Sequence, residues 1–169
     1  MITKQHQKTK RGFTIIEVVL VLAIAGLIFL MVFIALPALQ RSQRDTQRRD
    51  DMARFIAQLS QYQANNKGKV PGASASAYTT FINNYLKAGG DTFDDPSSGK
   101  AYVIKGVTNC TSAATCTQKS GTSSDTEVGN IFVYANATCN GEAPSYTKGA
   151  NKIAVTIKLE GAGVYCGHN

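Results

Sequence analysis

The chain has no tryptophan, only two histidines and few aromatic residues, and these absences limit what it can do. A protein of 169 residues with so few large side chains builds a modest core, which fits one domain plus an appendage. His6 lies near the start and His168 is the penultimate residue, so no Ser/His/Asp triad or H-x-x-H metal motif can be drawn. A P-loop is missing too. The sequence therefore predicts neither an enzyme nor a bound cofactor.

Acidic residues are absent from the first twelve positions, where Lys4, Lys8, Lys10 and Arg11 give a charge of +4. The whole chain has a formal charge of +7, so the remainder has only +3, from 14 basic and 11 acidic residues. This surplus is too weak to indicate a nucleic-acid partner, although it does not exclude one. The basic start instead predicts an N-terminus held in the cytoplasm and a remainder sent outward.

Polar side chains are absent from the nineteen residues between Val18 and Leu36. A helix of roughly 20 residues crosses a bilayer core, so this run is long enough to span it. A cleaved secretory signal is one alternative, but its apolar region usually has about 7–15 residues. A plain signal anchor is the stronger alternative, because the basic start and the long apolar run both fit it.

Neither alternative explains Glu17, an acid roughly one turn inside the apolar segment, where ionised groups are rare and need a partner. Arg11 lies six positions earlier, on another side of a helix. A cut between Gly12 and Phe13 would create an α-amino group on Phe13. In an assembly of parallel helices, that amine on one subunit could meet Glu17 of a neighbour, so the acid would specify register.

The stretch "KRGFTIIEVVLVLAIAGLIFLMV" resembles the N-terminus of type IV prepilins and of type II secretion pseudopilins. That family has a short basic leader ending in glycine, then Phe-Thr, two hydrophobic residues and Glu, then about twenty apolar residues. Residues 12–17 match each of these positions. The resemblance covers about a quarter of the chain, from Lys10 to roughly Gln47. One departure is Pro37, which lies near the outer end of the apolar segment and predicts a kink or local melting there.

By this resemblance, a prepilin peptidase cuts after Gly12 and N-methylates Phe13. The precursor is expected as a single-pass protein of the cytoplasmic membrane, in contact with lipid, and the mature chain as part of an extracellular pilus. An assembly ATPase and a platform protein are the implied partners, together with further copies in a helical filament. The alternatives are a pseudopilin or minor pilin of a secretion or DNA-uptake machine, or a signal-anchored binding domain that never polymerises.

The helix is expected to continue to about Asn66, with a cleaved leader at 1–12, a polymerisation helix at 13–39 and an amphipathic helix at 40–66. From Gln40 to Asp51 it is polar all round, which predicts either a solvated neck or salt bridges between subunits. Beyond this, apolar residues recur at helical spacing and predict a stripe that packs on a sheet. They are Met52, Phe55, Ile56, Leu59 and Tyr62.

Residues 67–169 are expected to form the head. A short helix over about Ala77–Ala88 and strands at Tyr102–Lys105, Asn130–Ala137, Lys152–Glu160 and within "GVYC" are predicted. The segments "TSAATCTQKSGTSSDTE" and "CNGEAPSYTKGAN" are predicted surface loops. The predicted fold is thus α+β, a long helix packed on a small antiparallel sheet with a disulfide-stapled C-terminal region. This is the pilin lollipop that the resemblance also implies.

All four cysteines, Cys110, Cys116, Cys139 and Cys166, lie in the last third of the chain. An even number beside a membrane-targeting N-terminus indicates disulfides formed outside the cytoplasm. Three pairings are open, and we favour the local pair Cys110–Cys116 with Cys139–Cys166. Zinc is the alternative, but there is no C-x-x-C pair and the spacings are irregular.

Two further motifs of the head have a structural and a functional interpretation. Asp91, Asp94 and Asp95 form an acidic group that predicts a capped turn, with a calcium site as the less favoured reading. Asn109 and Asn136 each start an N-x-S/T glycosylation pattern, which arises often by chance. No metal site is therefore expected.

Overall fold

The structure is a computed structural model that describes residues 12–120, 127–149, 151–161 and 163–169. The predicted leader, 1–12, lies outside the described residues except for Gly12. The chain forms two compact units, Met1–Leu39 and Gln40–Asn169, and we describe each by itself. The boundary falls where the apolar run gives way to the polar segment.

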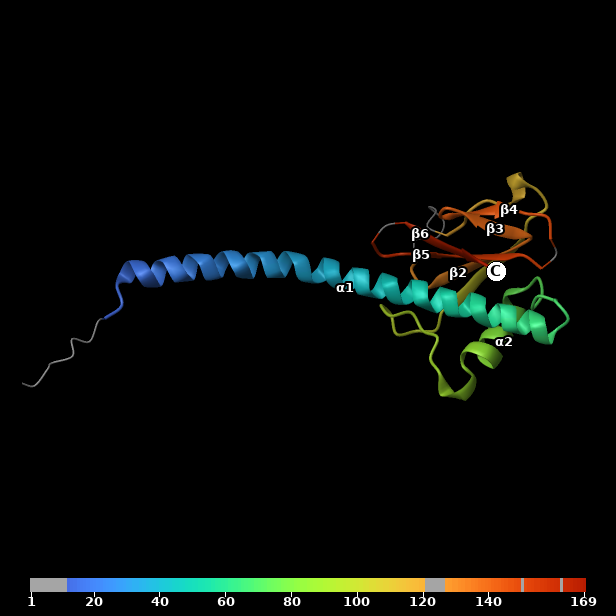
Figure 1. The fold of residues 1–169 in the computed structure, drawn as a ribbon, viewed down its shortest axis with the longest axis horizontal. Helices are drawn as coiled ribbons and strands as arrows, with labels where there is room; N and C mark the ends of the chain where they lie inside the picture. Colours follow the sequence, from blue (N-terminus) through green and yellow to red (C-terminus); the bar gives the residue numbers. More distant parts are fainter. Residues whose placement is uncertain (1–11, 121–126, 150, 162) are drawn as a thin grey trace, which may run out of the picture. The chain divides into compact units, whose positions relative to one another are not determined.

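Helix α1, Ile15–Asn65, begins in the first unit and ends in the second (Figure 1). The predicted helix is confirmed to within two residues at its start and one at its end. Pro37 lies inside α1, and the backbone stays helical there, so the expected local melting is wrong. Its missing N–H removes one backbone hydrogen bond, but the hydrogen bonds of the turns on either side maintain the helix.

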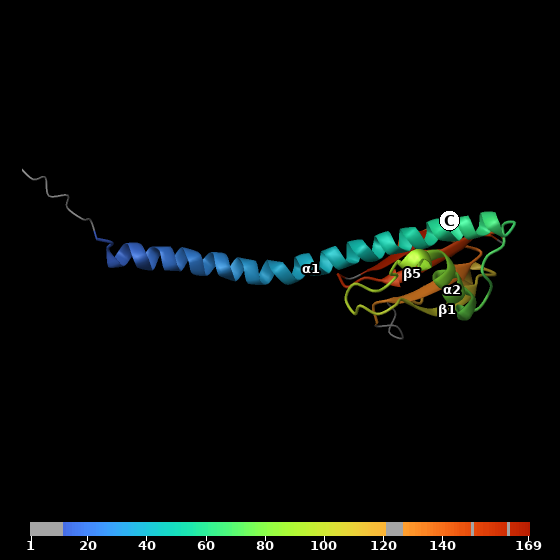
Figure 2. The same cartoon turned by 90° about the horizontal axis from the view of Figure 1, so that it is seen from below.

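In the second unit, α1 packs on a four-stranded sheet with the order β1-β2-β5-β6 (Figure 2). The strands are β1 (Val103–Asn109), β2 (Asn130–Ala135), β5 (Ile153–Lys158) and β6 (Val164–His168). β2, β5 and β6 pair antiparallel, as predicted, whereas β1 runs parallel to β2. A parallel neighbour needs a crossover connection of a dozen or more residues, and the sequence has 20 residues between the end of β1 and the start of β2.

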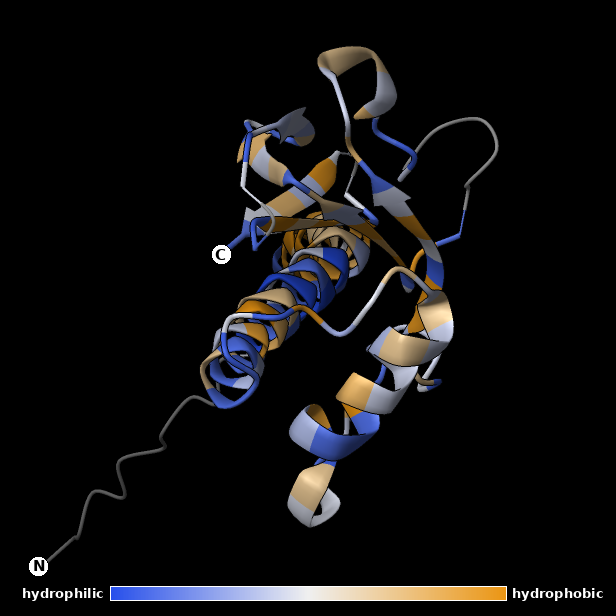
Figure 3. Cartoon of the chain, turned by 90° about the vertical axis from the view of Figure 1, so that its right-hand side faces the viewer, coloured by the Kyte–Doolittle hydropathy of each residue, from blue (hydrophilic) through white to orange (hydrophobic). Residues whose placement is uncertain are grey.

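The apolar stripe of α1 forms the centre of the hydrophobic core. Met52, Phe55 and Leu59 are fully buried, which confirms the face that the sequence predicted to meet the sheet. Apolar residues of both central strands alternate toward α1, because successive side chains on a strand point to opposite faces. On β2 the inward residues are Ile131 and Val133, in the same core cluster as the stripe. Figure 3, coloured by hydropathy, shows the sheet and the α2 segment on different sides of α1.

Helix α2, Ala75–Phe81, continues as a π-helical turn at Ile82–Leu86 and a 3₁₀ turn at Ala88–Gly90. Ser74 caps α2, since its Oγ accepts a hydrogen bond from the Ala77 N–H at 3.3 Å. The predicted short helix is therefore present, beginning two residues early. Phe81 packs edge-on against Phe55, with 5.3 Å between the ring centroids, and so joins α2 to the core.

The second predicted loop is wrong in part, because it contains a hairpin. Strands β3 (Ala137–Asn140) and β4 (Ala143–Tyr146) pair antiparallel as a separate two-stranded sheet. Asn136 separates β2 from β3 with a φ of 57°, a left-handed conformation that lets the chain leave the main sheet. Residues such as Pro144 are poor strand formers, so propensity alone conceals this hairpin.

Two disulfides join Cys110 to Cys116 and Cys139 to Cys166, the two pairs favoured from the sequence. The first closes a loop that contains a 3₁₀ turn at Ala113–Thr115. The second fastens β3 to β6 across the outer side of the sheet. Cys110, Cys116, Phe132, Tyr134, Ala137 and Ala154 form a second, smaller core cluster on this side. No free cysteine is present, so the zinc alternative is wrong.

Candidate processing and assembly site

The backbone at the predicted cut is accessible. Gly12, Phe13 and Thr14 are not helical and all three are exposed, with Phe13 91% exposed. Helix α1 starts at Ile15, two residues after the predicted scissile bond between Gly12 and Phe13. A protease must bind its substrate in an extended form, so a peptide bond just outside a helix is open to attack. The geometry is therefore compatible with cleavage at this bond.

Thr14 and Glu17 cap the start of α1 together. The Thr14 N–H and the Thr14 hydroxyl each donate to Glu17 Oε2 at 2.8 Å, and the Glu17 N–H donates to Thr14 Oγ1 at 3.4 Å. These reciprocal bonds form a capping box, which satisfies N–H groups that have no partner within the helix. Glu17 thus has a partner in its own chain.

The sequence analysis considered only charged partners for Glu17 and did not identify Thr14, whose neutral groups bind it in the same chain. The signal was readable, because "TIIE" has the T-x-x-E spacing of a capping box. Thr14 supplies neutral donors, and within the described part of the chain no cation pairs with Glu17. A positive partner for its charge stays a prediction about another subunit.

The helical part of the first unit exposes its apolar side chains. The helix is long and apolar enough to cross a membrane, and none of its most hydrophobic stretch is buried. A shallow, mostly apolar depression at its start is lined by Phe13, Ile16, Glu17, Val18, Leu20, Val21 and Leu22. Contiguous apolar surface of this extent marks a membrane or protein contact. Glu17 is one of its lining residues.

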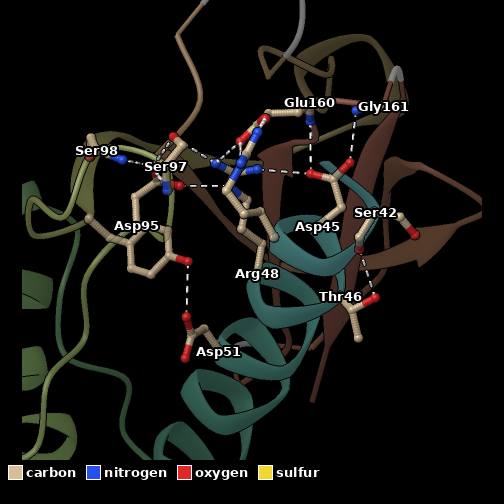
Figure 4. A network of polar contacts seen from close by, with 12 residues as sticks. Ser42, Asp45, Thr46, Arg48, Asp51, Asp95, Ser97, Ser98, Glu160 and Gly161 are labelled. Atoms are coloured by element: carbon tan, nitrogen blue, oxygen red, sulfur yellow. Dashed lines mark hydrogen bonds and ion pairs between the residues drawn. The ribbon is translucent and has the colours of Figure 1, made fainter. Parts of the chain in front are cut away.

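A second group of interacting polar residues lies in the second unit, around the fully buried side chain of Arg48 (Figure 4). Arg48 Nε donates to Asp95 Oδ1 at 2.6 Å, Nη1 donates to Asp45 Oδ1 at 2.8 Å and Nη2 donates to Glu160 Oε1 at 2.7 Å. Arg44 completes the group, with its Nη2 2.5 Å from Glu160 Oε2. We call Arg44, Asp45, Arg48, Asp95 and Glu160 the Arg48 cluster.

Backbone groups extend the Arg48 cluster into two turns. Asp45 accepts the N–H groups of Glu160 and Gly161, each at 2.8 Å, and so holds the turn that follows β5. Asp95 accepts the N–H groups of Ser97 and Ser98, each at 3.1 Å. One turn of α1 is thereby fastened to two loops that are distant in sequence.

The pKa shifts of Glu160, Asp95 and Arg48 all favour the charged forms of these groups. Hydrogen bonding from Arg44, and then from Arg48, lowers the pKa of Glu160 to about 2. Burial raises the pKa of Asp95, but the bonds from Arg48 and Ser97 outweigh it and the net shift is downward. Burial lowers the pKa of Arg48, and the hydrogen bonds of its carboxylate partners more than reverse this. These three groups are therefore charged at neutral pH.

The Arg48 cluster shows that the polar neck is not fully solvated, because Asp45 and Arg48 are buried within the second unit. Salt bridges between subunits stay a prediction for its exposed residues Arg41, Arg49 and Asp50. Within α1, Asp45 pairs with Arg48, three residues further along the helix. The sequence did signal that a helix polar on all sides needs partners. It did not signal that Asp95 and Glu160 are those partners.

In the acidic group Asp91, Asp94 and Asp95, two of the three side chains have cationic partners in the described structure. Asp95 caps a turn and pairs with Arg48, while Asp94 pairs with Lys87 at 3.3 Å. The capped-turn reading is thus confirmed for Asp95. No grouping of three or more potential metal ligands occurs among the residues that the structure describes. At the glycosylation patterns, Asn136 Nδ2 donates to Asn109 Oδ1 at 2.8 Å, so the two side chains are mutual partners.

Comparison with known proteins gives one finding, and it falls on the first of these two sites. Residues 7–33 match the family described as the prokaryotic N-terminal methylation motif, which is a prepilin-type signal. The matched segment includes Gly12, Phe13, Thr14 and Glu17. No curated protein and no solved structure matches the chain. The chain thus carries a prepilin-like N-terminus, joined to an α+β unit with two disulfides.

Proposed function

We propose that this protein is the precursor of a filament subunit, of a type IV pilus or a pilus-like fibre, and not an enzyme. The observation that carries the proposal is the coincidence of three features at one place. An exposed Gly12–Phe13 bond, a capped Glu17 and an unburied apolar helix all lie within or directly beside the matched motif. Each feature alone is common, whereas processing and assembly need all three.

In the proposed sequence of events, the precursor first crosses the cytoplasmic membrane once, with its apolar helix in lipid. A prepilin peptidase then hydrolyses the Gly12–Phe13 bond, and the new amine of Phe13 is N-methylated. An assembly ATPase and a platform protein move the mature chain into a fibre at the cell surface. In the fibre, the apolar helices of many copies pack against one another. The apolar surface that lipid covered in the membrane is then buried between subunits and stays out of water.

Glu17 has a defined role in this proposal. Its carboxylate can accept further hydrogen bonds, since both bonds from Thr14 go to Oε2 and a carboxylate has two oxygens that accept. The amine of Phe13 on a neighbouring subunit is a donor of suitable charge. The pair would set the register of one helix against the next. The two disulfides suit a head that works outside the cell.

The test is mass spectrometry of the N-terminus, on protein extracted from the membrane of cells that contain a prepilin peptidase. We expect a chain that begins with N-methylated Phe13. The matched control is a Gly12→Val variant, which should keep the intact leader. A wild-type chain that still begins with Met1 beside an active peptidase would rule out the proposal.

A pseudopilin or minor pilin carries the same N-terminal motif, so cleavage does not separate it from a major subunit. Abundance does, because a major subunit dominates the protein of sheared filaments. We expect this chain to be the principal component, since its stapled head suits an exposed fibre. A trace amount in filaments built of another subunit would assign it to the minor class.

A further inference from the structure

The two disulfides differ in their exposure to solvent. Cys110 and Cys116 are 0% and 6% exposed, so the bond between them is buried. Cys139 and Cys166 are only half-buried and pack against the smaller core cluster. Thiol–disulfide exchange begins when a thiolate attacks one sulfur atom of the bond, so its rate depends on access. An external thiol should therefore reach Cys139–Cys166 before Cys110–Cys116.

The two disulfides also differ in what they connect. Cys110–Cys116 closes a loop within one short segment. That segment is tied to β2 independently of the disulfide, because the Cys110 N–H donates to the Ala135 carbonyl at 3.0 Å. Cys139–Cys166 instead connects two separate elements, the hairpin β3–β4 and strand β6. The hairpin lies on the side of the sheet away from α1 and contacts both β5 and β6 (Figure 1).

The hydrogen bonds between the hairpin and β6 are long. Among the described residues there are two, from the Cys139 N–H to His168 Nδ1 at 3.3 Å and from the Val164 N–H to Glu142 Oε2 at 3.4 Å. Both exceed the usual donor–acceptor distance of about 2.7–3.2 Å. Ala137, at the start of the hairpin, is buried in the smaller core cluster. The disulfide is therefore the strongest connection between the hairpin and β6.

A buried hydroxyl lies beside this disulfide. Thr156 of β5 is paired with Cys166 of β6, so their side chains point to the same face of the sheet. Thr156 is fully buried, and its Oγ1 has no hydrogen-bond partner in the described structure. Burying a hydroxyl without a partner costs free energy, because the hydroxyl loses its hydrogen bonds to water. Movement of the hairpin away from β5 and β6 would let water reach this group and so relieve the cost.

The hairpin can move as one piece. Its strands are joined at their base, where the Thr147 N–H donates to the Asn136 carbonyl at 2.9 Å and the hydroxyls of Thr138 and Thr147 are 2.9 Å apart. The chain on either side bends at a residue with positive φ, at Asn136 before the hairpin and at Gly149 after it. Such residues are suited to absorb a change in backbone direction. Release from β6 would thus leave the pairing of β3 with β4 intact.

We propose that Cys139–Cys166 is a redox latch, which an external dithiol opens while Cys110–Cys116 stays closed. In the open form the hairpin leaves β6, and the sheet β1-β2-β5-β6 stays paired. This regulation is separate from processing and assembly, because it does not require cleavage after Gly12 or a second subunit. The latch and the proposed function can therefore fail independently.

The reaction is a thiol–disulfide exchange in two steps. A thiolate of the dithiol attacks one sulfur of Cys139–Cys166 and forms a mixed disulfide, and the other cysteine leaves as a thiolate that takes up a proton. The second thiol of the reagent then displaces the first cysteine in the same way. Both cysteines end as thiols and the reagent ends as a disulfide, so two electrons pass from the reagent to the protein. A disulfide reagent in excess reverses the reaction.

The first experiment measures which disulfide is reduced, on the full wild-type chain in non-ionic detergent. Dithiothreitol is the dithiol, free thiols are alkylated with iodoacetamide at a series of times, and peptide mass spectrometry locates the label. We expect Cys139 and Cys166 to be labelled at least about tenfold faster than Cys110 and Cys116, because access limits the attack. Equal rates, or faster labelling of Cys110 and Cys116, would overturn the proposal.

The second experiment measures what reduction releases, by hydrogen exchange of the same protein before and after treatment. We expect faster exchange in β3 and β4 and unchanged exchange in β2 and β5, with the original pattern restored by oxidised dithiothreitol. C139S/C166S should show the open pattern without reagent, whereas the matched control C110S/C116S should keep the closed pattern. Faster exchange throughout β2 and β5 would show a staple of the whole unit instead of a latch. Failure of oxidation to restore Cys139–Cys166 would show that the change is not reversible, and would also overturn the proposal.

Discussion

Arg48 Nε lies 2.6 Å from Asp95 Oδ1, and the two side chains are 0% and 2% exposed. The arginine is on α1 and the aspartate is on the loop before β1, 47 residues later. Removing one member of a buried ion pair is strongly destabilising, because it leaves the other charge without a partner in a site that water does not reach. The Arg48 cluster should therefore dominate the stability of the head.

The first prediction concerns Arg48→Ala, which leaves three carboxylates around an empty site. We expect the free energy of unfolding to fall by about 3 kcal/mol or more, within the range for breaking buried pairs. The measurement is the denaturant midpoint of the full chain in detergent, followed by tyrosine near-ultraviolet circular dichroism. Arg49→Ala is the control, because Arg49 is exposed and such surface changes usually stay within about 0.5 kcal/mol. Equal midpoints would contradict the assigned role.

The second prediction concerns acid. The pKa of Glu160 is lowered from 4.5 to about 2, so the folded state binds this proton less readily than the unfolded chain. Its contribution is present above pH 4.5 and is lost as the pH falls toward 2. We expect the thermal midpoint to drop across this window. In Glu160→Gln the neutral pH midpoint should be lower and the drop shallower, whereas Asp50→Asn should keep the wild-type profile. A drop of unchanged steepness in Glu160→Gln would count against this assignment.

The sequence predicted α1 and the central strands because their signals are local. A membrane-length apolar run, a helical stripe and two β-rich segments each need only neighbouring residues to be read. The Arg48 cluster was not predictable in the same way. A polar stretch of helix indicates that partners are needed, but Asp95 and Glu160 are 47 and 112 residues from Arg48, and only the folded chain brings them together.

The hairpin β3–β4 and the parallel strand β1 show the same limit. The segment around Pro144 and Gly141 has the composition of a loop, and the Cys139–Cys166 bond and packing beneath it make the hairpin stable. The parallel pairing of β1 with β2 depends on a crossover whose path the composition does not reveal. The capping box of Thr14 and Glu17 is a different case. Its T-x-x-E spacing is local, so the sequence alone could have predicted it.

The third prediction compares the two disulfides. In the chain-entropy view, a bond stabilises by restricting the unfolded chain, and more so for longer loops. The separations are 27 residues for Cys139–Cys166 and 6 for Cys110–Cys116. We expect C139S/C166S to lose about 3.5 kcal/mol and C110S/C116S about 2 kcal/mol. Denaturant midpoints of the two double variants test the order, and a larger loss in C110S/C116S would show that loop length does not decide it.

The last prediction separates the two roles that Glu17 can have. Glu17→Gln removes the charge but keeps an amide oxygen that can accept from Thr14, whereas Thr14→Val removes the capping hydroxyl and keeps the charge. If the carboxylate pairs with the Phe13 amine of a neighbour, Glu17→Gln should abolish filaments. Thr14→Val should then still assemble, with a helix start weakened by about 1 kcal/mol. Electron microscopy of sheared preparations reads out assembly, and mass spectrometry confirms that both variants are still cleaved after Gly12. The opposite pattern, filaments with Glu17→Gln and none with Thr14→Val, would mean that Glu17 serves as a helix cap and that the pairing between subunits is wrong.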